Sequence, residues 1–125
     1  MLVIASHDRD AALSIAVALG CRYVQFEALY STNHDILVVC DSEKSPGQDA
    51  DIHPGYLKRG MTVLDARGTL EKSHLVREAQ ERGCAVVGPV QVWLEQVAMQ
   101  ARLLTGKEVA KQMLADAAPW VMEQE

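Results

Sequence analysis

The run DILVVC, residues 35–40, is the feature that most restricts how this chain can fold. Its apolar residues are consecutive and mostly β-branched, which is typical of a strand buried on both faces of a parallel sheet. Weaker apolar runs occur at residues 2–5, 61–65 and 84–87, and residues 22–26 alternate like a short strand. Amphipathic helical segments separate several of these strands, at residues 10–19 and 71–82. This alternation predicts an α/β fold of three layers, a parallel sheet with helices on both faces.

A strand–turn–helix unit follows at residues 84–106. Gly88 and Pro89 stand where a strand passes into a helix, and Gly106 stands where that helix should end. Within it, apolar residues recur at helical spacing: Val90, Trp93, Leu94, Val97, Ala101 and Leu104. Beyond it, Val109, Met113 and Ala117 predict the packed side of a last helix at residues 108–117, which Pro119 and Trp120 should end.

Size and charge narrow the possible functions. The chain has 125 residues, the length of one domain, and 49% hydrophobic residues, so we expect a single unit over residues 1–125. A net charge of -5 argues against a nucleic acid or an anionic membrane as partner. The three cysteines lack metal-type spacing, and no apolar run is long enough for a signal peptide or a membrane span. We therefore expect a cytoplasmic protein without a metal site.

The predicted fold indicates where a ligand would bind. In open parallel sheets, ligands lie outside the carboxyl ends of the strands, which here means residues 6–9, 41–45, 65–69 and 88–91. Asp41 and Asp65 stand at the ends of their strands, where a carboxylate either accepts a hydrogen bond from a ligand or caps a turn. The spacing of the residues does not decide between these two roles. The sequence contains no GxGxxG, P-loop, HExxH or nucleophile-elbow motif.

One alternative is a receiver domain of two-component signalling. The segments LVIASHDRDAAL and DILVVCD resemble the acidic pocket and the phosphoacceptor strand of that family, with Asp41 in the acceptor position. However, Ala5-Ser6-His7 stand where an acidic pair is expected, and Gly88-Pro89 stand where a lysine is expected.

A more extensive resemblance covers most of the chain. DILVVCDS is similar to the DIVVNATS strand and loop of the shikimate dehydrogenases, including the form fused to 3-dehydroquinate dehydratase. GMTVLDARGTLEKSHLVREAQERGC resembles that family's strand with D-x-x-Y-x-P-x-x-T and LL-x-x-A-x-x-x-G, and QVWLEQVAMQARLLTGK resembles its M-x-x-x-Q-A helix ending in F-x-x-x-T-G. The resemblance implies the C-terminal, NADP-binding domain, a three-layer Rossmann-like parallel sheet without its first βα unit and without the domain that carries the catalytic lysine and aspartate.

The resemblance also implies roles for particular residues. Gln96 aligns with the glutamine that hydrogen-bonds a hydroxyl of shikimate, and Gly68 replaces a substrate-binding tyrosine. The positions that would contact NADP are Ser6, His7, Arg9, Cys40, Asp41, Ser42, Gly88 and Val92. Several of these depart from the family pattern: Ser6-His7-Asp8 replaces Asn-Arg-Thr, Val39-Cys40-Asp41 replaces Asn-Ala-Thr, Leu70 replaces a proline and Pro89 a glycine.

These departures define the functional expectation. Loss of the arginine that clamps the 2'-phosphate leaves Arg9 as its only nearby substitute, while Asp8 would repel a phosphate. We expect a segment of an enzyme that reduces 3-dehydroshikimate to shikimate with NADPH, with no catalytic residue of its own and weak or absent activity alone. The second hypothesis is a non-catalytic Rossmann-like module for assembly or regulation. Either way, we expect a homo-oligomer, because an incomplete sheet exposes an edge strand and an apolar face.

Overall fold

A computed structural model describes residues 1–40, 52–68 and 70–124. The chain divides into two compact units, residues 1–34 and 35–125. Unit 1 consists of β1 (Val3–Ser6), α1 (Arg9–Leu19), β2 (Arg22–Gln25) and a 3-10 helix, η1 (Phe26–Ser31). Its two strands pair in parallel, with Val3 opposite Arg22, and α1 buries Ala12 and Ala16.

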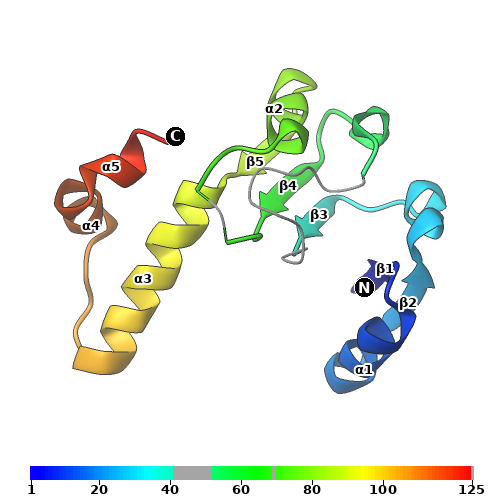
Figure 1. The fold of residues 1–125 in the computed structure, drawn as a ribbon, viewed down its shortest axis with the longest axis horizontal. Coiled ribbons are helices and arrows are strands. Elements are labelled where there is room, and N and C mark those ends of the chain that lie inside the picture. The colour runs from blue at the N-terminus through cyan, green and yellow to red at the C-terminus, as the bar shows by residue number, and fades with distance from the viewer. Residues whose placement is uncertain (41–51, 69, 125) are drawn as a thin grey trace. The chain divides into compact units, whose positions relative to one another are not determined.

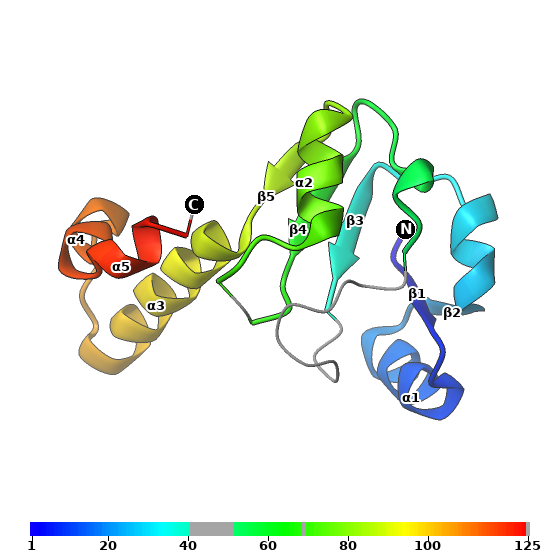
Figure 2. The ribbon, with the colours of Figure 1, turned by 45° about the horizontal axis from the view of Figure 1, so that its top comes forward.

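Unit 2 begins with β3 (Ile36–Val39) and a short 3-10 helix, η2 (Pro54–Tyr56). It continues with β4 (Thr62–Asp65), α2 (His74–Glu81) and β5 (Ala85–Val87), and it ends with α3 (Pro89–Thr105), α4 (Lys111–Ala117) and α5 (Pro119–Met122). The strands form a parallel sheet in the order β3-β4-β5. Helix α2 packs on β4 and β5, and α3 leads away from the sheet with α4 and α5 folded back beside it (Figures 1 and 2).

The strand pairings match parts of a known parallel sheet. A dinucleotide-binding sheet has the strand order 3-2-1-4-5-6. In that order strands 2 and 3 are neighbours and strands 4, 5 and 6 are neighbours, as are the observed β1-β2 and β3-β4-β5. The predicted Rossmann-like parallel α/β class is therefore confirmed.

The core of unit 2 lies between its sheet and α2. Val63, Val76 and Ala79 are fully buried, and each buried aliphatic side chain of valine or leucine size contributes about 1.5–3 kcal/mol. The prediction that the strand at residues 35–40 is buried on both faces was wrong: Leu37 and Val39 are buried, but Ile36 is 63% and Val38 is 49% exposed. Alternate residues of β3 are therefore buried and exposed, although all four residues of the strand are apolar.

The C-terminal helices form a second apolar cluster. Val90 and Leu94 of α3 pack with Ala118 and Val121, and the partly buried residues around them are Leu70, Trp93, Leu114, Ala115 and Met122. The predicted seam of Val109, Met113 and Ala117 was wrong, since Met113 is 64% exposed. Helix α4 ends at Ala117, just before Pro119 as predicted, and Pro119 then begins the short helix α5.

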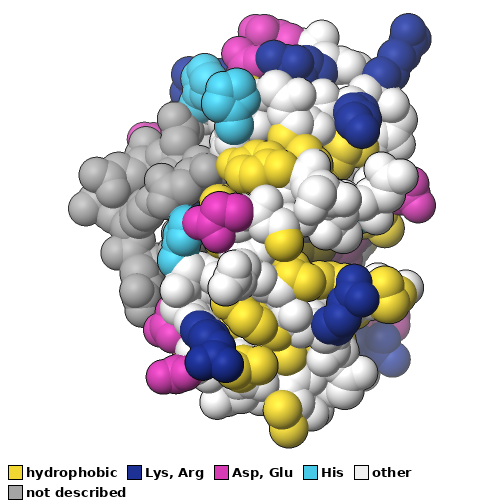
Figure 3. Space-filling model, turned by 90° about the vertical axis from the view of Figure 1, so that its right-hand side faces the viewer, with side chains coloured by type: hydrophobic (Ala, Val, Ile, Leu, Met, Phe, Trp, Pro, Cys, Tyr) yellow, Lys and Arg dark blue, Asp and Glu magenta, His cyan; other side chains and the backbone are white. Residues whose placement is uncertain are grey.

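Apolar and charged side chains are mixed on the surface. On the face shown in Figure 3, hydrophobic side chains are exposed among both basic and acidic ones. No helix in the described part of the chain is long and apolar enough to cross a membrane.

Candidate functional site

The carboxyl ends of β3, β4 and β5 share one edge of the sheet in unit 2. The register pairs Val39 with Asp65 and Leu64 with Val87, so the residues that follow these strands are neighbours. The amide of Ala66 donates to the carbonyl of Val39 at 2.9 Å, which places Cys40 beside the loop that begins at Asp65. This edge is where the sequence predicts a ligand, and its best-defined polar feature is centred on Asp65.

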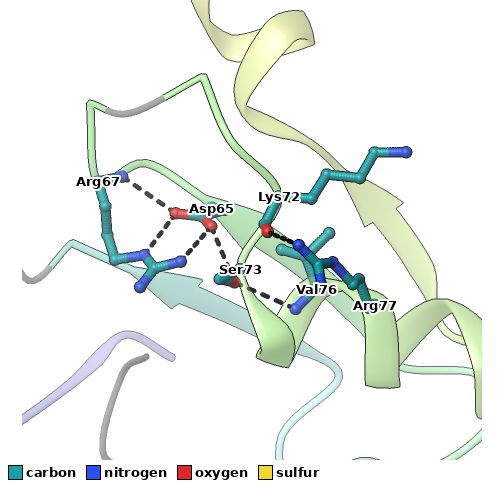
Figure 4. Close-up of polar contacts among 6 residues, drawn as sticks. All are labelled: Asp65, Arg67, Lys72, Ser73, Val76 and Arg77. Carbon is teal, nitrogen blue, oxygen red and sulfur yellow. Dashed lines mark hydrogen bonds and ion pairs between the residues drawn. The ribbon is translucent and has the colours of Figure 1, made fainter. Parts of the chain in front are cut away.

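Asp65 is buried because of its position on β4. Side chains on a strand alternate between faces, and Asp65 shares the face of the fully buried Val63, leaving it only 2% exposed. A buried carboxylate needs a charged or hydrogen-bonding partner. The guanidinium of Arg67 supplies it, through hydrogen bonds from Nε to Oδ1 at 2.8 Å and from Nη2 to Oδ2 at 2.6 Å (Figure 4).

Two further donors complete this arrangement. The backbone amide of Arg67 donates to Oδ1 of Asp65 at 3.2 Å, and the hydroxyl of Ser73 donates to Oδ2 at 3.3 Å. The same hydroxyl accepts from the amide of Val76 at 3.2 Å and thereby caps α2 (Figure 4). Asp65 therefore ties the end of β4 to the start of α2.

The chemistry of Asp65 follows from these contacts. Burial by itself raises its pKa, but the hydrogen bonds and positive charge of Arg67, with a smaller effect of Ser73, outweigh burial and leave the pKa below its usual value. Asp65 is therefore ionised at neutral pH and neutralised by Arg67. Such a carboxylate is poorly suited to accept a proton from a substrate, so the pair serves to hold the loop.

Gly68 follows Arg67 and has a φ of 76°, the left-handed region that favours glycine. A Cβ at this residue would meet no atom within 4 Å, so the backbone conformation alone favours glycine here. Its predicted role as a substrate contact remains a prediction.

The predicted residues at the start of α3 lie at the same edge of the sheet. Gly88 is the N-cap of α3 and has an ordinary φ of -79°, and a Cβ added to it would meet nothing within 4 Å. The space beside its backbone is therefore open. A small hollow of about 60 Å³ lies next to it, lined by Lys72, Gln80, Val86, Gly88, Pro89, Val90 and Gln91. Val92 is half-buried in the first turn, and Gln96 is exposed one turn further along.

Three further predicted cofactor residues, Ser6, His7 and Arg9, belong to unit 1, at the turn between β1 and α1. The hydroxyl of Ser6 accepts from the amide of Asp8 at 3.1 Å, and the carboxylate of Asp8 accepts from the amide of Ala11 at 3.1 Å as the N-cap of α1. The ring of His7 stacks on Phe26 with centroids 4.0 Å apart. Arg9, the first residue of α1, is exposed. Asp41 and Ser42 lie outside the described residues.

Sequence reasoning named Asp65 but missed Arg67 and Ser73. The available signal was local: a basic residue two positions after a buried strand-end carboxylate, and a serine immediately before a helical segment. Among the described residues, no group of three or more His, Cys, Asp or Glu side chains could hold a metal ion.

No protein-family model and no curated protein matches the sequence. Solved structures do match. Shikimate 5-dehydrogenase from Thermus thermophilus, in complex with NADP(H) and shikimate, is 20% identical over 95% of this chain and 45% of its own, with a TM-score of 0.72. Quinate dehydrogenase from Corynebacterium glutamicum, in complex with NAD, is 19% identical over 92% of this chain and 44% of its own, with a TM-score of 0.77.

A shikimate 5-dehydrogenase-like protein gives a TM-score of 0.79 and 22% identity, covering 97% of this chain and 46% of its own. The chain thus spans less than half the length of each of these proteins. At these identities the likeness concerns the fold. The chain has the Rossmann-like fold of a dehydrogenase domain, of the kind found in shikimate and quinate dehydrogenases.

Proposed function

We propose that the chain is the C-terminal nucleotide-binding segment of a shikimate dehydrogenase that acts within a longer protein and reduces 3-dehydroshikimate to shikimate. The observation that carries the proposal is the fold likeness, which extends over 92–95% of the chain in dehydrogenases of shikimate and quinate and over 97% in a shikimate 5-dehydrogenase-like protein. The nicotinamide dinucleotide would supply the hydride. The residues of this chain would bind and orient the ligands.

The turn between β1 and α1 is the proposed site for the adenosine ribose. Asp8 places a carboxylate at the start of α1, and Asp10 adds a second carboxylate in the first turn. A ribose 2'-hydroxyl can donate to such a carboxylate, whereas a 2'-phosphate would be repelled by it. The charges therefore favour NAD over the NADP that the family resemblance implies.

The edge beside α3 is the proposed site for the nicotinamide and the substrate. Gly88 presents its backbone without a side chain, and open space lies next to it. Gln96 is exposed, and its amide can donate and accept at once, which suits a ring hydroxyl. Asp65 and Arg67 would keep the neighbouring loop in place.

The experiment is an assay of shikimate oxidation, with NAD and NADP compared, using the complete natural polypeptide that contains this chain. Gln96→Ala should raise KM for shikimate about tenfold or more, the loss expected for a hydrogen bond to a substrate hydroxyl. The matched control is Gln100→Ala, one turn further along α3 and also exposed, which should leave KM unchanged. Absence of dehydrogenase activity would refute the proposal and favour a non-catalytic module.

A further inference from the structure

The outward face of α3 carries an apolar stripe, of which the proposed function uses Gln96 alone. Val92, Gln96, Met99 and Leu103 follow one another at spacings of four, three and four residues, which keeps them on one side of the helix. This side lies opposite the buried Val90. Met99 is 65% and Leu103 is 79% exposed. The stripe has the spacing of a helix-pairing seam, with a single polar residue, Gln96, inside it.

The charges beside the stripe indicate what pairs with it. Glu95 and Arg102 lie seven residues apart, so both flank the stripe on the same side. If a second α3 packs antiparallel on the first, the side of the stripe that carries Glu95 and Arg102 meets the same side of the second helix. Glu95 of each copy then faces Arg102 of the other. If the helices pack parallel, Glu95 instead faces Gln100 of the other copy, and the charges find no opposite partner. The charge pattern is therefore complementary to itself in the antiparallel arrangement.

We infer that α3 is an interface between two copies of this chain, which pair antiparallel about a two-fold axis through the middle of the helix. Gln96 then opposes Met99 of the second copy, and Val92 opposes Leu103. The apolar side chains lose their exposure to water, and the two Glu95–Arg102 pairs set the direction of the helices.

Both charged residues can take new partners at little cost. Glu95 pairs with Lys111 in the same chain, and these side chains are 63% and 59% exposed. Arg102 pairs with Glu108 at 3.4 Å, with side chains 69% and 83% exposed. Exposed ion pairs contribute little to stability, so exchange with a second copy is not opposed by the existing contacts.

The inference goes beyond the proposed function and does not depend on it. The seam is short, so association should be weak and should vary with protein concentration. Because the pairing covers Gln96, a dimer would withhold that residue from a substrate. Enzyme assays at low protein concentration would observe the monomer.

The first test is sedimentation velocity across concentrations from micromolar to millimolar, without ligand. The protein should show a reversible monomer–dimer equilibrium. Leu103→Lys should raise the dissociation constant about tenfold or more. The matched control is Leu104→Lys, because Leu104 is 87% exposed but lies off the stripe, and its dissociation constant should stay unchanged. A wild-type protein that stays monomeric throughout, or equal effects of the two variants, would overturn the inference.

The second test is a charge exchange. Glu95→Arg and Arg102→Glu should each weaken association, since each places like charges opposite one another. The double variant should restore the dissociation constant to within about twofold of wild type. Circular dichroism confirms that each variant is folded. A double variant that associates no better than the single ones would exclude the antiparallel pairing.

Discussion

Arg67 binds Asp65 through two parallel hydrogen bonds, from Nε to Oδ1 at 2.8 Å and from Nη2 to Oδ2 at 2.6 Å. The Arg67 side chain is 7% exposed and the Asp65 side chain 2%, so the pair is shielded from water. Because the two residues are separated by only one position, the pair fixes the path of the chain as it leaves β4. The pair therefore holds the start of this loop in place at the carboxyl edge of the sheet.

Removing the guanidinium should strongly destabilise the protein. Arg67→Ala leaves the buried carboxylate of Asp65 without its cation, a change that costs about 3–5 kcal/mol. Arg77→Ala is the matched control. Arg77 is exposed and donates a 3.2 Å hydrogen bond to the carbonyl of Lys72, so its loss should cost less than about 0.5 kcal/mol. Urea unfolding measures the free energy of unfolding of both variants. Similar losses in Arg67→Ala and Arg77→Ala would show that the buried pair is not the source of the stability.

The same pair sets an acid dependence of stability. The hydrogen bonds and charge of Arg67 hold the folded-state pKa of Asp65 below its ordinary value, so the stability that Asp65 contributes is fully present above about pH 4 and is lost as pH falls through the folded pKa. In Arg67→Ala, burial instead raises the pKa of Asp65, and protonation relieves the penalty. The stability difference between wild type and Arg67→Ala should therefore shrink on acidification. Urea unfolding from neutral to acidic pH tests this, and a constant difference would contradict it.

Ser73 connects Asp65 to α2, so its removal should affect the helix. Ser73→Ala loses the cap to the amide of Val76 as well as the bond to Asp65, and should cost about 0.5–2 kcal/mol. Ser73→Thr keeps the hydroxyl and should remain within about 0.5 kcal/mol of wild type. Thermal unfolding compares the two. Equal destabilisation by both variants would indicate that volume, rather than the hydroxyl, matters at this position.

Asp8 should control the choice between dinucleotides if the proposed function holds. Asp8→Asn keeps an N-cap for α1 but removes the charge, and should raise the affinity for NADP relative to NAD about tenfold. Asp116→Asn makes the same change of net charge on α4 and should leave that ratio unaltered. Titration calorimetry on the complete natural polypeptide measures the ratio. An unchanged ratio in Asp8→Asn would exclude this residue from the ribose site.

The regular elements were largely predictable, because short-range patterns determine them. Gly106 ends α3 in the left-handed conformation with a φ of 69°, as its position after the helical apolar pattern predicted. The start of α2 was predicted three residues too early, because Ser73 caps the helix and the preceding residues form the loop around Asp65. The prediction of which side of α4 packs was also wrong, because that side depends on how the chain turns after Gly106.

The site was less predictable than the fold. Asp65 stood out because it ends a strand, but its pairing with Arg67 depends on a loop whose path includes the positive φ of Gly68. The exposure of Ile36 and Val38 likewise depends on what packs against the sheet, which no run of β-branched residues specifies. Neither the Asp65–Arg67 pair nor the exposure of Ile36 and Val38 can be predicted from the neighbouring residues in the sequence alone.

The most direct test of the proposed function is a map of dinucleotide binding by two-dimensional amide NMR, on the complete natural polypeptide that contains this chain. Addition of NAD at millimolar concentration should shift the amides of Ser6, His7, Arg9, Cys40 and Gly88, which lie at or just after the carboxyl ends of their strands. Amides in α4, such as that of Gln112, should stay unchanged. Shifts confined to other residues, or none at all at millimolar NAD and NADP, would contradict the account.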